Sequence, residues 1–260
     1  MPARQLLLVG FVFPLLLVGC SGQSSLTGGG LLGANGEGSG QISAQPRDVS
    51  FNPFGEGEGS GVARQRQVIE KPSISEVMQP GPLPEMVIGR ADAPVTIIKY
   101  ASLTCPYCRK FQVETFPVLK REYIDTGKVR FIIREFPIGF QSGAATIALR
   151  CAPAKQYFNL YDKFMRQQSK WVSQTVRREP IFQVASQVGL SRQRFDACFA
   201  DKTLSASLNQ IKERGRTLGV IGTPNYFVNG RLIKRRLTMR DIHKLVSEGL
   251  AKPVAAANNG

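Results

Sequence analysis

Two cysteines separated by two residues, Cys105-Pro106-Tyr107-Cys108, carry the clearest chemistry in this sequence. Thiols at this spacing can close a small disulfide ring and open it again by thiol–disulfide exchange. Where such a pair opens a helix, the free N–H groups and the helix dipole stabilise a thiolate on the first cysteine. We therefore predict that Cys105 is the exposed nucleophile and that Cys108, one turn into the helix, is the resolving thiol.

Other uses of this cysteine pair fit the sequence less well. A zinc site would need a second cysteine pair at ligand spacing, and the sequence has none. A purely structural disulfide at this spacing would constrain little chain. The single histidine, His243, is expected at the boundary of an amphipathic helix rather than as a catalyst, and we predict neither a metal nor a cofactor.

The elements that must position the cysteines can be located by composition and periodicity. Strand composition marks residues 85–88, 95–101, 128–135, 225–228 and 231–233, and helical periodicity marks residues 109–126, 143–152, 156–167, 177–188, 204–217 and a last helix from 238. Pro117 is expected to kink the first helix near Phe116. Ser191 should cap a further helix, and Asn229-Gly230 should form a hairpin turn. The order of elements predicts an α/β sheet interrupted by an all-helical insertion.

A second motif, Gly222-Thr223-Pro224, lies directly before the strand at 225–228. With the strand at 95–101, the cysteine motif and the helical insertion, it makes the chain closely resemble the DsbA-like branch of the thioredoxin superfamily over roughly residues 84–250. The resemblance implies a thioredoxin fold, a cis peptide bond before Pro224, and substrate binding by the backbone at Thr223 and Pro224. An ordinary trans proline that opens a strand is the alternative.

The resemblance also divides the chain into segments. Residues 76–138 and 218–252 would form the two parts of the thioredoxin domain, and residues 139–217 the helical insertion. The segment 253–260 is expected to be a frayed tail.

Two residues depart from the DsbA-like pattern. Tyr107 stands where many relatives have histidine, so Cys105 is expected to be less acidic than in the strongest oxidants, and the motif also matches glutaredoxins. Lys99 occupies the position, six residues before the first cysteine, where such proteins commonly bury an acid that relays protons. A lysine there would favour a thiolate unless it points outward, and Glu135 is a candidate replacement only if it points inward.

Cys151 and Cys198 both fall in the helical insertion. Related DsbA-like proteins often carry a second disulfide there, which implies a structural Cys151–Cys198 bond. A second redox pair and two free buried thiols are the alternatives.

The N-terminus has the features of an export signal. Residues 1–19 combine Arg4 with an apolar run too short to span a bilayer comfortably, and predict a signal peptide. The run ends in Leu17-Val18-Gly19-Cys20, which resembles a lipoprotein lipobox and implies acylation of Cys20; a cleaved signal with an incidental cysteine is the alternative. Residues 20–75 predict a flexible Gly/Ser-rich tether, either a leash that lets an anchored domain sample its partners or a simple spacer.

The charge is uneven along the chain. The net charge is +15, and residues 95–260 carry 28 Lys and Arg against 11 Asp and Glu. Lys234-Arg235-Arg236 and the arginines of the insertion could favour anionic lipid or acidic substrates, or form an ordinary solvated face. Export makes nucleic acid an improbable partner.

Together these features predict an exported, lipid-anchored thiol–disulfide oxidase located in the periplasm or otherwise outside the cytoplasm. Its partners would be unfolded or reduced exported proteins, and the family resemblance implies a membrane quinone-linked protein that reoxidises it. The alternatives are an isomerase or reductase of the same fold and a non-catalytic, chaperone-like lipoprotein.

Overall fold

The structure, a computed structural model, describes residues 67–251. The predicted signal peptide, Cys20, most of the predicted tether and the tail from 253 lie outside these residues, so those predictions stay predictions. Within residues 67–251, no helix is both long enough and apolar enough to cross a membrane.

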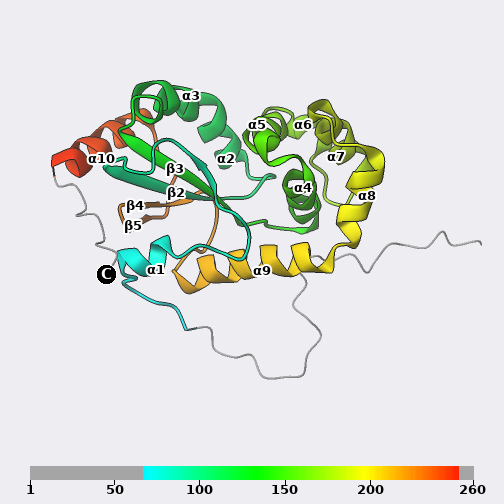
Figure 1. Ribbon diagram of the computed structural model, residues 1–260, viewed down its shortest axis with the longest axis horizontal. Coiled ribbons are helices and arrows are strands. Elements are labelled where there is room, and N and C mark those ends of the chain that lie inside the picture. Colours follow the sequence, from blue (N-terminus) through cyan, green and yellow to red (C-terminus); the bar gives the residue numbers. More distant parts are fainter. Residues whose placement is uncertain (1–66, 252–260) are drawn as a thin grey trace, which may run out of the picture. The chain divides into compact units, whose positions relative to one another are not determined.

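A mixed five-stranded sheet forms the centre of the described part, with strand order β1-β3-β2-β4-β5 (Figure 1). The strands are Met86–Ile88 (β1), Val95–Ala101 (β2), Val129–Glu135 (β3), Asn225–Val228 (β4) and Arg231–Ile233 (β5). β2 and β3 are parallel, and the other neighbours are antiparallel. The predicted limits of β2, β4 and β5 are confirmed, and Asn229 and Gly230 both have the positive φ that the hairpin turn requires.

Helices surround the sheet and form the insertion beside it (Figure 1). Their bounds are Ile74–Met78 (α1), Pro106–Lys110 (α2), Phe116–Leu119 (α3), Phe140–Cys151 (α4), Tyr157–Arg166 (α5), Gln168–Trp171 (α6), Arg178–Ala185 (α7), Arg192–Ala200 (α8), Lys202–Thr217 (α9) and Met239–Ala251 (α10). Short 3-10 turns cover Ala154–Gln156 and Ser186–Val188. The fold is therefore the predicted α/β arrangement with a helical insertion.

The two faces of the sheet are covered by different helices. On one face, Val95 and Ile97 of β2 pack in the main core with residues of α2, α3, α10 and the insertion, and on the other, Ile98 and Tyr100 pack against residues of α1 and the segment after α9. The predicted insertion range includes α9, which runs along this second face (Figure 1). Its Gly215 lets the helix approach closely, because a Cβ there would stand 2.7 Å from the Tyr100 ring.

The helical segment that follows the cysteine motif is irregular. It begins at Pro106 rather than at residue 109, and π-helical turns at Phe111–Thr115 and Lys120–Ile124 alternate with α2 and α3. Phe116, the residue after the first π turn, donates its N–H to the Phe111 carbonyl. Since Pro117 has no N–H to donate, regular α-helical bonding cannot continue through it. The hydrogen-bonding pattern thus changes next to Phe116, and the predicted kink stays a prediction.

Two other local predictions can be compared with the structure. Ser191 caps α8, as predicted, by accepting from Arg194 N–H at 3.3 Å. Helix α1 lies at the end of the predicted tether and was not expected. Its signal is present in the sequence, since Ser73 and Glu76 form a complete capping box.

Candidate active site

The cysteine motif occupies the start of helix α2, at the end of the loop that follows β2. Cys105 is the N-cap residue, Pro106 is the first helical residue, and Cys108 N–H donates to Cys105 Sγ at 3.3 Å. Cys105 is partly exposed, Cys108 is fully buried, and both are free thiols. The structure thus places an accessible sulfur at a helix N-terminus and a second sulfur beneath it, in the predicted order.

The two sulfurs differ in acidity. A hydrogen bond from the Cys108 side chain, helped by the N–H groups of Cys108 and Tyr107 and opposed by burial, lowers the pKa of the Cys105 thiol to about 6. Burial raises the pKa of the Cys108 thiol well above its ordinary value. At neutral pH the arrangement favours a Cys105 thiolate beside a protonated Cys108.

The proline loop faces the first cysteine. The Thr223–Pro224 peptide bond is cis, as the family resemblance implied. The Cys105 thiol donates to the Thr223 carbonyl at 3.1 Å, although 118 positions separate the two residues in the sequence. The loop before β4 therefore lies directly against the predicted nucleophile.

Lys99 points inward, toward the cysteines. It is completely buried, and its Nζ lies 4.4 Å from the centre of the Phe111 ring and 5.4 Å from that of Tyr161. Burial lowers the pKa of Lys99 to about 8, and the nearby Cys108 and Cys105 sulfurs oppose this shift. Lys99 does not point outward, and this is the condition under which we predicted that a lysine at this position favours a cysteine thiolate.

Glu135 also points inward, but it is engaged elsewhere. Its two carboxylate oxygens accept from Arg150, at 2.5 and 2.8 Å, and one of them also accepts from the Tyr157 hydroxyl at 2.7 Å. A carboxylate held by these donors is a structural ion pair between β3 and the insertion. Glu135 thus meets the condition of pointing inward, but its carboxylate is held in this ion pair, and the proton-relay role stays a prediction.

Apolar side chains surround the Cys105 end of the molecule. Tyr107, Ile138, Phe140 and Ile221 are exposed by 50% or more, and Ile221 reaches 79%. Ile138 and Ile221 line a common hollow of about 540 Å³. Of these four, only Tyr107 belongs to a motif that the sequence marks. Ile138 and Ile221 lie in loops, and Phe140 is the first residue of α4.

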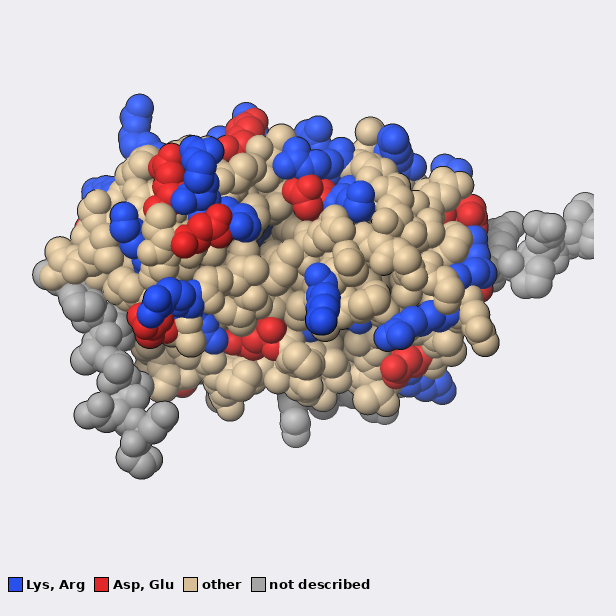
Figure 2. Space-filling model, turned by 45° about the horizontal axis from the view of Figure 1, so that its top comes forward, with Lys and Arg blue, Asp and Glu red and all other residues tan. Residues whose placement is uncertain are grey.

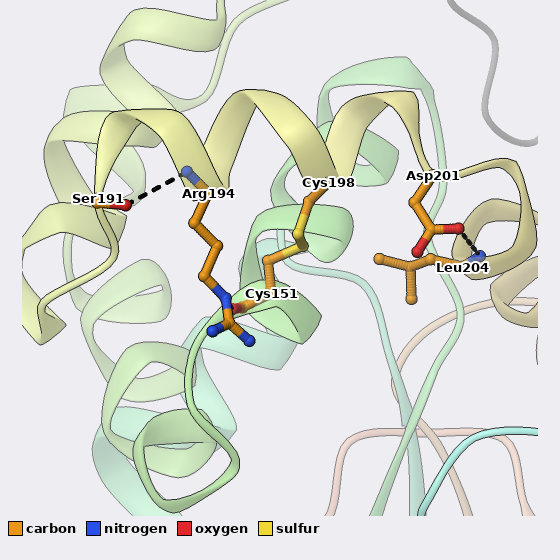
Figure 3. The surroundings of a disulfide bond; sticks show 6 residues. All are labelled: Cys151, Ser191, Arg194, Cys198, Asp201 and Leu204. Carbon is orange, nitrogen blue, oxygen red and sulfur yellow. Dashed lines mark hydrogen bonds between the residues drawn. A yellow bond between two sulfur atoms is a disulfide. The ribbon is translucent and has the colours of Figure 1, made fainter.

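The predicted disulfide in the insertion is present. Cys151, at the end of α4, is bonded to Cys198 of α8, with the Cα atoms 6.2 Å apart (Figure 3). Arg194 of α8 crosses the same junction and donates from Nε to the Cys151 carbonyl at 3.0 Å. The bond joins two helices of the insertion, so neither free thiols nor an open second dithiol describes this state.

The remaining candidate residues lie in ordinary surface settings. Arg235 pairs with Asp241 at 2.7 Å and Arg236 with Glu114 at 3.5 Å, so the basic segment is partly neutralised. On the face seen in Figure 2, Lys and Arg are scattered among uncharged residues, and several lie beside Asp and Glu, as on a solvated surface. His243 is exposed and bonds to the Tyr123 hydroxyl.

Comparisons with known proteins agree with this geometry. A family model described as "Thioredoxin" matches residues 83–248. The crystal structure of alpha-DsbA1 from Wolbachia pipientis superposes with a TM-score of 0.62 at 26% identity, covering 69% of this chain and 99% of that one. This chain is a DsbA-like member of the thioredoxin superfamily.

Relatives of this DsbA-like chain carry names from disulfide chemistry. A Rickettsia bellii protein named as a protein-disulfide oxidoreductase is 33% identical over 175 residues, which are 65% of this chain and 66% of that protein. A Bacillus anthracis protein named as disulfide bond formation protein D is 29% identical over 151 residues, which are 56% of this chain and 70% of that protein. The chain thus spans slightly less than two thirds of the Rickettsia relative.

Proposed function

We propose that this DsbA-like protein is an exported thiol–disulfide oxidase that introduces disulfide bonds into other proteins through Cys105 and Cys108. The observation that carries the proposal is the difference between the two sulfurs. Cys105 has a pKa of about 6 and is accessible, whereas Cys108 is buried with a raised pKa. A stabilised Cys105 thiolate favours the reduced form, which makes the disulfide a ready oxidant.

The proposed reaction consists of two sulfur displacements. A substrate thiolate attacks Cys105 Sγ of the oxidised protein, a substrate–Cys105 bond forms, and the electron pair of the Cys105–Cys108 bond leaves on Cys108 Sγ. A second substrate thiolate then attacks the substrate sulfur of this mixed disulfide. Cys105 leaves as a thiolate, which its low pKa makes favourable, and the substrate keeps the disulfide.

The surface around Cys105 suits an unfolded substrate chain. The Thr223 carbonyl, already 3.1 Å from Cys105 Sγ, can instead accept from a substrate backbone N–H, with Pro224 beside it. Ile138 and Ile221 would contact apolar side chains that a folded protein keeps inside. Reduced or unfolded exported proteins are therefore the proposed substrates.

The proposal includes the site of action and the source of oxidising power. A signal peptide at 1–19 and a lipid on Cys20 would hold the protein on the extracytoplasmic side of a membrane, with residues 20–75 as its tether. A quinone-linked membrane protein would reoxidise the dithiol. Labelling with a radioactive fatty acid tests the anchor. The wild type should incorporate label and Cys20→Ser should not. Absence of label in the wild type would show that Cys20 carries no lipid.

The reduction potential of the Cys105–Cys108 pair tests the direction of electron flow. It can be measured by equilibration with glutathione buffers, with Cys151→Ala/Cys198→Ala as a control that isolates the pair. A value between about −120 and −180 mV would support an oxidase or, at its lower end, an isomerase. A value near −270 mV would show a reductase and contradict the oxidase.

A cellular experiment separates redox chemistry from simple chain binding. Cys105→Ser should abolish disulfide formation in exported proteins while leaving the fold and the apolar surface in place. Full function of this variant in the cell would instead indicate a non-catalytic, chaperone-like lipoprotein.

A further inference from the structure

A buried lysine without a polar partner lies beneath the cysteine pair. Lys99 is 0% exposed, and among residues 67–251 no group accepts a hydrogen bond from its Nζ. The faces of the Phe111 and Tyr161 rings, at 4.4 and 5.4 Å, lie against the amine and favour its charge. Lysines are almost never fully buried unless they are paired, so this position calls for a compensating charge.

The groups that face Lys99 identify that charge. From the α2 region these are Cys108 and Cys105, from α5 Tyr161, and from β4 Tyr226, which lies opposite Lys99 in the strand register. Burial raises the pKa of both tyrosines well above the ordinary value, so they stay neutral. A carboxylate is also found on this face of β3, at Glu135, but Arg150 neutralises it. Among the described residues facing Lys99, a cysteine thiolate is thus the anion that can form.

We propose that Lys99 supplies the charge and the proton that the buried Cys108 sulfur needs whenever the Cys105–Cys108 bond opens or closes. This inference rests on the proposed redox role of that pair. Without a nearby cation, a thiolate on the fully buried Cys108 would be a strongly disfavoured leaving group and would rarely form as a nucleophile.

The proton and electron pair can be followed in both directions. When a substrate thiolate attacks Cys105 Sγ, the electron pair of the broken S–S bond leaves on Cys108 Sγ. The ammonium group of Lys99 balances this charge. It is not hydrogen-bonded to Cys108 in this structure, so it passes its proton to the sulfur, and becomes a neutral amine, only when the lysine side chain moves toward Cys108. In the closing direction, the Cys108 thiol gives its proton to the Lys99 amine and attacks Cys105 Sγ, and the substrate thiolate leaves.

Two features make this exchange feasible at physiological pH. The pair of Lys99 and Cys108 has no net charge whether the proton lies on nitrogen or on sulfur, so its transfer leaves the net buried charge unchanged. Moreover, burial lowers the pKa of Lys99 to about 8, and both of its forms are therefore accessible near neutrality. Arginine, which keeps its proton, could supply only the charge.

Reaction of the reduced full chain with dithiobis(nitrobenzoate), followed by rapid mixing, tests the proposal. Cys105 attacks first and releases one nitrothiophenolate as the mixed disulfide forms. Cys108 then attacks Cys105 Sγ and releases the second. The second phase depends on the Cys108 thiolate alone. All proteins would carry Cys20→Ser, so that the redox pair supplies the reactive thiols.

Lys99→Met should slow the second phase roughly tenfold or more at about pH 7, since each unit of pKa changes the thiolate fraction tenfold. The midpoint of its pH profile should move upward, and the first phase should change less. Lys128→Met is the matched control, because Lys128 also lies over a ring, 5.8 Å from that of Tyr123, but is exposed. It should behave like the wild type.

The outcomes separate this inference from the proposed function. If wild type releases two equivalents in two phases, and both Lys99→Met and Lys99→Gln fold and match its second phase and midpoint, Lys99 has no such role. If wild type does not release the second equivalent, the Cys105–Cys108 pair is not a redox pair, and the proposed function fails with it.

Discussion

Each face of the sheet buries one long basic side chain, and the two have very different surroundings. Arg134 of β3 is 5% exposed on the face covered by α1 and α9. It pairs with Glu85, donates to the Tyr100 hydroxyl, and donates to the carbonyls at the end of α1. Lys99 of β2 is 0% exposed on the opposite face, and no group within residues 67–251 accepts from its Nζ.

The difference in hydrogen bonding indicates different roles for Arg134 and Lys99. A buried cation whose N–H groups all have acceptors has a structural role, and Arg134 connects α1 and Glu85 to the sheet. A buried cation without an acceptor weakens the fold, because desolvation is not offset by hydrogen bonds. Such a residue is consistent with chemistry, and the charges that act on Lys99 are those of the two cysteine sulfurs.

The largest effect on stability is expected for Arg134→Met. The change leaves Glu85 and the carbonyls at the end of α1 without their donor, and should cost about 3–5 kcal/mol of the free energy of unfolding. Urea denaturation followed by circular dichroism measures it. A loss below about 1 kcal/mol would show that Arg134 does not hold α1 and Glu85 to the sheet, and the contrast with Lys99 would no longer apply.

Lys99→Met, in contrast to Arg134→Met, is expected to increase the free energy of unfolding. The pKa of Lys99 falls from 10.5 to about 8 on folding, so the folded state disfavours the charged amine. Below about pH 8 Lys99 is charged in both states, and its removal should stabilise the protein by up to about 3 kcal/mol. The unfolded state binds more protons between about pH 8 and 10.5, so wild-type stability rises there and the advantage of the variant disappears.

Urea denaturation of both proteins across this pH range measures the effect, with Lys128→Met as control. If Lys99→Met is less stable than wild type at neutral pH, then Lys99 makes a stabilising contact and is not the unsatisfied charge described here.

Much of the site could be predicted from the sequence because its signals are local. The roles of Cys105 and Cys108 were predicted from their spacing and from their position between a strand and a helix. The limits of β2 follow from a run rich in β-branched and aromatic residues. Pro224 and the Cys151–Cys198 bond were identified through the family resemblance, since no local rule pairs distant residues.

The rest depends on packing between distant segments. Alternation along β2 places Lys99 and Ile97 on one face, but only the docking of α2 and α5 decides that this face holds the cysteines. The inward direction of Glu135 was similarly undetermined, and so was its pairing with Arg150, 15 positions away. The hollow between Ile138 and Ile221 joins two loops that no periodicity connects.

A smaller effect is expected for Glu85→Gln, which sharpens the account of Arg134. Arg134 keeps the Tyr100 hydroxyl and the α1 carbonyls as acceptors, so the loss of one charge should cost about 1–2 kcal/mol. In a double-mutant cycle with Arg134→Met, the Glu85 substitution should have little further effect. Additive losses would mean that Glu85 and Arg134 stabilise the protein independently.

The smallest effect is expected on the pKa of Cys105 in Lys99→Met. It tests which of the two cysteines Lys99 acts on. Hydrogen bonds from the Cys108 side chain and from backbone N–H groups hold the pKa of Cys105 at about 6, below its ordinary value of 9.0. Reduced wild type therefore gains stability as the pH rises from about 6 to 9, because the unfolded state binds more protons there. Lys99→Met should raise the pKa of Cys105 by less than about one unit, measured by thiolate ultraviolet absorbance. A larger rise would mean that Lys99 acts on the attacking sulfur, and its assignment to Cys108 would have to be reversed.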